Sequence, residues 1–60
     1  MKYKRVLDNS GTGFNIGDIV TLIKHASLGV LWQNADGLLQ FIDLWQLGPA
    51  ITLNKNIKIL

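Results

Sequence analysis

The chain offers few side chains that could catalyse a reaction. His25 could in principle act with Ser10 or Ser27 and an aspartate as a nucleophilic set. Such a set needs an oriented base and an oxyanion site inside a pocket, and a chain of 60 residues leaves little room for one. The four aspartates show no spacing that suggests paired acid–base work. We therefore interpret His25 as a solvated loop residue and expect no catalytic residues.

A glycine series early in the chain approaches a phosphate-binding motif without matching it. Gly11, Gly13 and Gly17 nearly spell GxGxxG, but the third glycine comes one residue late. The motif also requires a following helix, whereas the residues from Ile19 to Ile23 are β-prone. One histidine and four aspartates without paired spacing do not favour a metal site either. We interpret the glycines as turn residues and expect no cofactor and no metal.

The two tryptophans are the main candidates for contact with another molecule. Each could fill the core or anchor an interface, because tryptophan is enriched among interface hot spots. We favour a core position for Trp32 and a partly exposed position for Trp45. A single helical turn points successive side chains in different directions, so one turn cannot bury every apolar residue of the segment around Trp45. The candidate protein-binding residues are therefore Leu44, Trp45, Leu47 and Trp32.

Basic residues gather at the two ends of the chain. The first and last strands of a small barrel are often neighbours, so these residues could form one basic face: Lys2, Lys4, Arg5, Lys55 and Lys58. We favour a solvated face that keeps a hydrophobic protein in solution, and contact with phosphate or an acidic protein surface is the alternative. A net charge of +2 falls well short of the charge typical of nucleic-acid-binding proteins.

Short β-strands joined by turns are expected to position these residues. The positive φ that glycine tolerates lets residues 11–18 form a wide turn, and Asn34 to Gly37 have the composition of a tight hairpin turn. We expect a loop over residues 25–29 and a short helical turn after Asp43 that Gly48 and Pro49 close. The expected strands are residues 2–7, 19–23, 30–33, 38–42 and 50–53, with a short edge strand over 57–60.

Composition predicts one domain, residues 1–60, with more apolar side chains than its core can bury. Hydrophobic residues make up 48% of the chain and charged residues only 17%. A domain this small has proportionally more surface, so we expect an exposed apolar patch for a partner or for a second copy of the chain. The chain lacks cysteine, a bilayer-spanning segment and the apolar stretch of a signal peptide. We expect a cytoplasmic protein without membrane contact.

The order of these elements resembles an SH3-like small β-barrel. Three segments are similar to such barrels: GFNIGDIVTLI (13–23), NADG (34–37) and DLWQLGP (43–49). The chain also resembles short bacteriophage-encoded proteins of that type, in which "DNSG.GF..G..V.LI" and a "DG" hairpin recur. The resemblance implies an all-β fold, a single SH3-like barrel of about five strands with one short helical turn before the last core strand. The acidic stretch and paired tyrosines of peptide-binding SH3 domains are missing, so proline-rich peptide binding is not expected.

The function expected from these observations is binding, not catalysis. We expect a small non-enzymatic module that docks on a larger protein, and the resemblance implies a phage-encoded protein that modulates or inhibits a host protein. The alternative is a small nucleic-acid-binding barrel that uses the basic terminal strands. Self-association is compatible with both.

Overall fold

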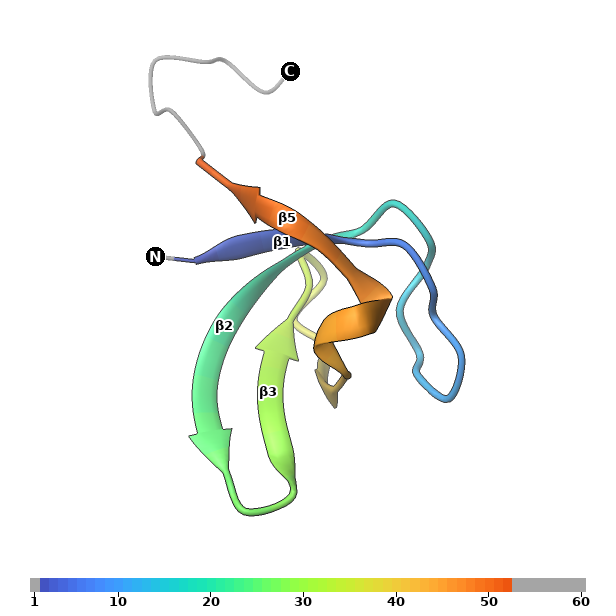
Figure 1. Ribbon diagram of the computed structural model, residues 1–60. Coiled ribbons are helices and arrows are strands. Elements are labelled where there is room, and N and C mark those ends of the chain that lie inside the picture. The colour runs from blue at the N-terminus through green and yellow to red at the C-terminus, as the bar shows by residue number, and fades with distance from the viewer. Residues whose placement is uncertain (1, 53–60) are drawn as a thin grey trace.

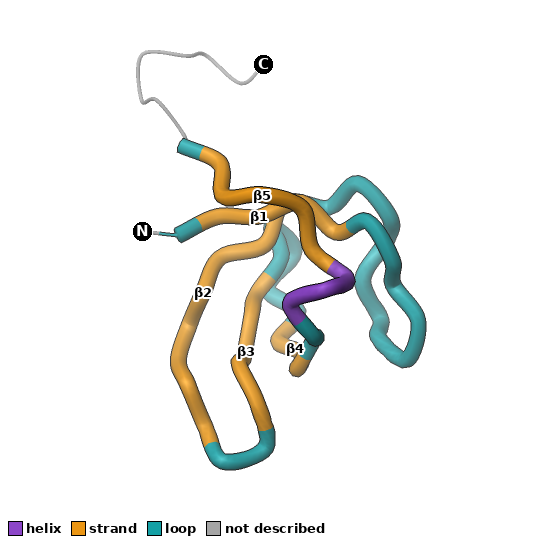
Figure 2. Tube along the Cα trace, in the orientation of Figure 1, coloured by secondary structure: helices purple, strands orange, loops and turns teal. Residues whose placement is uncertain are grey.

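The structure is a computed structural model that describes residues 2–52. These residues form one five-stranded antiparallel sheet with the strand order β4-β3-β2-β1-β5. Figure 1 shows that the sheet is strongly curved, and Figure 2 shows the short turn of 3-10 helix, η1, between β4 and β5. The elements are β1 (Tyr3–Val6), β2 (Ile19–Ala26), β3 (Gly29–Gln33), β4 (Leu39–Phe41), η1 (Leu44–Gln46) and β5 (Leu47–Ile51).

The all-β fold expected from the sequence is confirmed, including the short helical turn before the last strand. β1 pairs with both β2 and β5, so the first and last described strands are neighbours. β4 and β5 form the two edges of the sheet, and among residues 2–52 they do not pair with each other. The sheet is therefore open rather than a closed barrel. The expected edge strand over residues 57–60 lies outside the described residues.

The core lies on the concave face of the sheet and draws one or two residues from almost every segment. Because side chains alternate across a strand, each short strand contributes only a few inward residues. The buried hydrophobic residues are Val6, Phe14, Val20, Trp32, Ile42 and Leu47, with Leu22 and Val30 packed against them. Phe14 comes from the wide loop over residues 7–18, so this loop closes one end of the core.

Two backbone hydrogen bonds and a left-handed glycine, the latter predicted from the sequence, shape this wide loop. Gly17 has a φ of 95°, and its N–H donates to the carbonyl oxygen of Val6 at 2.8 Å. The N–H of Val6 donates in turn to the carbonyl oxygen of Asp18 at 2.8 Å, which closes the loop at its base. A left-handed φ at this position favours glycine, because other residues meet steric cost there.

The hairpin over residues 34–37 is also confirmed. Gly37 has a φ of 92°, and the side-chain oxygen of Asn34 accepts hydrogen bonds from the N–H groups of Asp36 and Leu38. An asparagine that bonds the backbone two residues ahead is a typical turn initiator, which is why the local sequence was sufficient here.

Two expected boundaries were wrong. The predicted loop over 25–29 is mostly strand: β2 runs to Ala26, pairs with Gly29 of β3, and leaves only Ser27 and Leu28 in the turn. A bulge at Ile23, where three β2 residues face two on β3, adds local twist to this long strand.

The last strand also begins earlier than expected. β5 starts at Leu47 and contains Gly48 and Pro49, which the sequence suggested as a helix stop before a strand over 50–53. Lys4 pairs with Ala50 and Val6 pairs with Leu47. Between these two pairs β5 advances by three residues and β1 by two, so the register of the two strands shifts. A proline is tolerated at such a bulge on an edge strand, because its missing N–H removes no ladder hydrogen bond.

Candidate protein-binding surface

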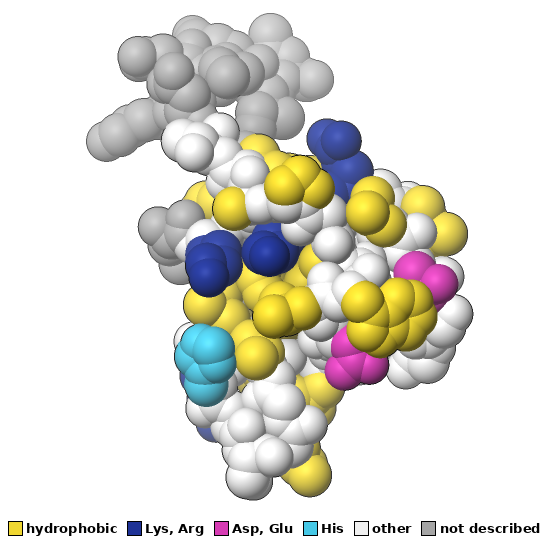
Figure 3. Space-filling view, viewed as in Figure 1, with side chains coloured by type: hydrophobic (Ala, Val, Ile, Leu, Met, Phe, Trp, Pro, Cys, Tyr) yellow, Lys and Arg dark blue, Asp and Glu magenta, His cyan; other side chains and the backbone are white. Residues whose placement is uncertain are grey.

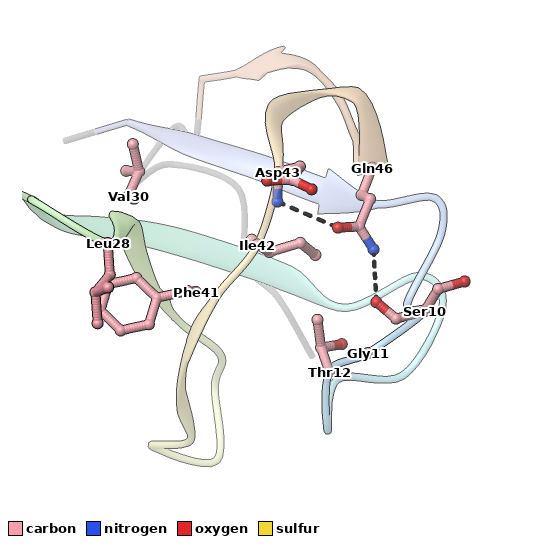
Figure 4. Close-up of a pocket in the computed structure, with 10 residues that line it drawn as sticks. Ser10, Gly11, Thr12, Leu28, Val30, Phe41, Ile42, Asp43 and Gln46 are labelled. Carbon is pink, nitrogen blue, oxygen red and sulfur yellow. Dashed lines mark hydrogen bonds between the residues drawn. The ribbon is translucent and has the colours of Figure 1, made fainter.

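The buried side chain of Gln46 fixes the position of η1. Only 4% of this residue is exposed. Its Oε1 accepts a hydrogen bond from the N–H of Asp43 at 3.2 Å, and its Nε2 donates to the carbonyl oxygens of Asp8 at 2.9 Å and Ser10 at 3.0 Å. Figure 4 shows the amide between Asp43 and Ser10. A buried amide whose donor and acceptor are both satisfied holds the segments that it joins in one arrangement.

Backbone hydrogen bonds add to this attachment. The carbonyl oxygen of Gln46 accepts from the N–H groups of Leu7 at 2.8 Å and Asp8 at 3.1 Å, and the N–H of Gln46 donates to the carbonyl oxygen of Asp43 at 3.0 Å. The turn is therefore bonded to the wide loop through both its side chain and its main chain. This role of Gln46 was not expected from the sequence, although the Asp43-x-x-Gln46 spacing is the signature of a capping box.

Two large apolar side chains of η1 point into solvent. Leu44 is 58% exposed and Trp45 is 68% exposed. Successive residues of a 3-10 turn are about 120° apart, so a turn that buries its third residue, Gln46, directs the other two elsewhere. We call these two residues the Leu44–Trp45 patch. On the face in Figure 3, hydrophobic side chains lie over η1 with acidic side chains beside them.

The structure separates the four predicted protein-binding residues. The expected exposure of Trp45 and the expected core position of Trp32 are both confirmed, since Trp32 is only 1% exposed. Leu47 is also buried, because it belongs to β5 and faces the core. Of the four candidates, only Leu44 and Trp45 are thus placed where a partner could contact them. Leu47 is corrected from a surface position to the core, and Trp32, in the core position favoured for it, is removed from the binding candidates.

The predicted basic residues do not share one face in the described part of the chain. Side chains alternate along β1, so Arg5 lies on the face opposite to Lys4 and Lys2. Lys4 is half-buried, opposite the buried Val20. Lys55 and Lys58 lie outside the described residues. The nucleic-acid alternative thus gains no continuous basic surface from residues 2–52.

The other residues considered for chemistry lie in separate elements. His25 is exposed in β2 rather than in a loop, Ser27 is in the following turn, and Ser10 is in the wide loop. No group of three or more metal-binding side chains occurs within residues 2–52. In that same part of the chain, no helix has the length and apolar character needed to cross a bilayer.

An open pocket of about 190 Å³ lies on the inner side of η1. Figure 4 shows Leu28 and Phe41 together on one side and the polar groups of Ser10 and Thr12 on the other. Gln46 contributes to its lining, but both ends of the Gln46 amide already hold hydrogen bonds to protein.

Comparison with known proteins assigns no family. No family model matches the chain, and no curated protein or solved structure matches it.

Proposed function

We propose that this chain is a small non-enzymatic protein-binding module that docks on a larger protein through the Leu44–Trp45 patch. The observation that carries the proposal is a tryptophan 68% exposed on a turn that a buried amide holds in place. An exposed indole has a large apolar area, and removing that area from water at a partner surface contributes favourable free energy to binding.

The rigid attachment of η1 supports this proposal as much as the exposure does. A side chain on a flexible segment loses conformational freedom when it binds, and that loss weakens the complex. Here Gln46 makes hydrogen bonds through its N–H, its carbonyl and its side chain, so the turn is ordered before any partner arrives. Preorganised tryptophans of this kind are typical hot-spot residues.

We extend the proposal to the type of fold, an SH3-like small barrel, and to the source of the protein, a bacteriophage. The element order of strand, wide loop, three strands, 3-10 turn and strand supports an SH3-like small barrel. The resemblance to short phage-encoded proteins of that type extends the proposal to a host protein as partner. Docking would then modulate or inhibit that protein in the cytoplasm of the host.

The experiment is capture of partners from a bacterial lysate by the immobilised wild-type chain, with identification by mass spectrometry. The affinity of the purified partner is then measured for three chains: wild type, Trp45→Ala and Leu28→Ala. Truncation of a hot-spot tryptophan costs about 2 kcal/mol or more, so Trp45→Ala should weaken binding about 30-fold. Leu28, 83% exposed in the β2–β3 turn, is the matched control and should bind like wild type.

Two results would contradict the proposal. One is the recovery of no partner at physiological salt. The other is equal loss of affinity in Trp45→Ala and Leu28→Ala, which would mean that exposed apolar area in general, rather than this patch, drives binding.

A further inference from the structure

Carboxylates lie at both ends of the turn that carries Trp45. Asp43 directly precedes Leu44 and is exposed. Asp8 is joined to the other end, because its N–H and carbonyl oxygen both bond to Gln46, the residue after Trp45. Figure 3 shows acidic side chains on either side of hydrophobic ones over η1. Two negative charges therefore flank the Leu44–Trp45 patch.

Local hydrogen bonds favour the charged form of Asp8. Its Oδ1 accepts from the backbone N–H of Ser10 at 2.8 Å. Hydrogen bonds from the hydroxyl and the N–H of Ser10 hold the pKa of this carboxyl below its ordinary value of 3.8. Asp8 is thus ionised at neutral pH.

The basic residues of the described chain lie on elements other than η1 and the wide loop. Lys2, Lys4 and Arg5 are in or next to β1, and Lys24 is in β2. The chain as a whole has a net charge of +2, yet its most exposed aromatic residue has acidic neighbours. Within residues 2–52, the charges next to the patch are thus opposite in sign to the net charge of the chain.

The exposed indole and the two carboxylates favour the same kind of contact. The face of a tryptophan ring attracts a Lys or Arg cation, and a carboxylate attracts the same cation. Acidic residues on the partner would instead face two like charges without compensation, which opposes association.

From this charge arrangement, and resting on the proposed function, we infer that the partner presents a basic protein surface. Its apolar side chains contact the indole of Trp45, and Lys or Arg side chains that flank them face Asp8 and Asp43. Complementary charge of this kind accelerates encounter and selects the orientation of docking, while the indole supplies most of the affinity.

The test uses three synthetic peptides that share the same apolar residues and differ only in their flanking positions, which are Arg and Lys, Gln, or Glu. Binding of each labelled peptide to the full chain is followed by fluorescence anisotropy. At low salt the basic peptide should bind about tenfold more tightly than the acidic one, and this preference should shrink at about 0.5 M salt because the exposed charges are screened. Trp45→Ala should weaken binding of all three peptides.

A matched pair of variants locates the charge that matters. Asp43→Asn and Asp36→Asn change the net charge equally, and both replaced residues are exposed. Asp36 lies in the 34–37 hairpin turn rather than beside η1. Asparagine is also a good cap residue, so Asp43→Asn should leave the turn intact. We expect Asp43→Asn to reduce the basic-over-acidic preference about threefold and Asp36→Asn to leave it unchanged.

The inference is overturned if the three peptides bind equally, if none binds up to about 1 mM, or if Asp36→Asn has the same effect as Asp43→Asn. Its failure is distinct from failure of the proposed function. If Trp45→Ala still weakens binding to the captured natural partner while the peptides show no charge preference, docking through the patch is supported. In that case only the inference that the partner surface is basic is wrong.

Discussion

The two tryptophans of this chain occupy opposite environments. Trp32 lies in β3, 1% exposed, between the cross-strand neighbours Leu22 and Gln40. Trp45 lies in a three-residue turn and is 68% exposed. The same side chain therefore serves as the largest core residue in one place and as the most prominent surface aromatic in the other.

What separates them is how each segment is held. β3 has a neighbouring strand on both sides, so its inward residue is enclosed by the sheet and the core. η1 is held instead by polar groups, because Gln46 occupies the inward position and satisfies backbone groups of the wide loop. A polar residue at the buried position leaves the neighbouring indole without an apolar place to pack.

The largest expected effect tests the core side of this comparison. Trp32→Ala removes the largest fully buried side chain and should destabilise the domain by about 4 kcal/mol. A domain of this size has a total stability of about 3–9 kcal/mol, so by circular dichroism the variant should be either unfolded or melt far below wild type. Trp32→Phe, which keeps much of the volume, should retain a cooperative melt. A folded Trp32→Ala with an unchanged melting temperature would contradict the assignment of Trp32 to the core.

The next effect tests the polar attachment of η1. Gln46→Ala leaves two backbone carbonyls and one N–H without their side-chain partner, which should cost about 2 kcal/mol in urea unfolding. Gln40→Ala is the matched control, because this half-buried glutamine of β4 has the same side chain in a less critical position, and we expect a loss below about 1 kcal/mol. Equal losses in the two variants would show that the attachment adds nothing specific.

A smaller effect concerns the loop to which η1 is attached. Gly17→Val forces a β-branched residue into a φ of 95° and should destabilise the domain by more than about 1 kcal/mol. Within residues 2–52 and apart from the two chain neighbours, no atom lies within 4 Å of the added Cβ, so the loss arises from backbone conformation and not from a clash of that atom. Gly17→Asn, which tolerates a left-handed conformation better, should lose less. The same melting temperature for wild type and Gly17→Val would mean that the loop does not depend on this conformation.

The smallest effect on stability belongs to the exposed tryptophan. Trp45→Ala should change the free energy of unfolding by less than about 0.5 kcal/mol, because the side chain is mostly solvated. The fluorescence that remains comes from buried Trp32 and should resist quenching by acrylamide. Unfolding of this variant would place Trp45 in the core and remove the Leu44–Trp45 patch.

Local sequence was sufficient where a turn is specified by the residues that form it. The Asn34–Gly37 hairpin, the left-handed Gly17 and the short turn after Asp43 are all determined by nearby residues. Exposure of Trp45 followed from the brevity of its segment. The sequence favoured burial of Trp32 but did not determine it, because a β-strand has two faces and tertiary packing decides which face is covered.

Features that depend on distant residues were not predictable in the same way. The extension of β2 to Ala26 requires pairing with β3, and the place of Pro49 inside β5 requires the bulge against β1. The Gln46 side chain reaches partners 36 and 38 residues earlier in the chain, a contact that no local pattern contains. Barrel closure was inferred by resemblance, and the described sheet is open.

The indole nitrogen of Trp32 provides a way to measure how often the core opens to solvent. The indole Nε1 of Trp32 is fully buried and has no hydrogen-bond partner among residues 2–52. Its proton can exchange with deuterium only when the core opens enough to admit solvent, whereas the indole proton of exposed Trp45 needs no such opening. The exchange rate of the first proton relative to the second therefore measures the free energy of the opening that exposes the core. The indole proton of Trp32 thus reports opening of the core, and the indole proton of Trp45 serves as the reference for its exchange rate.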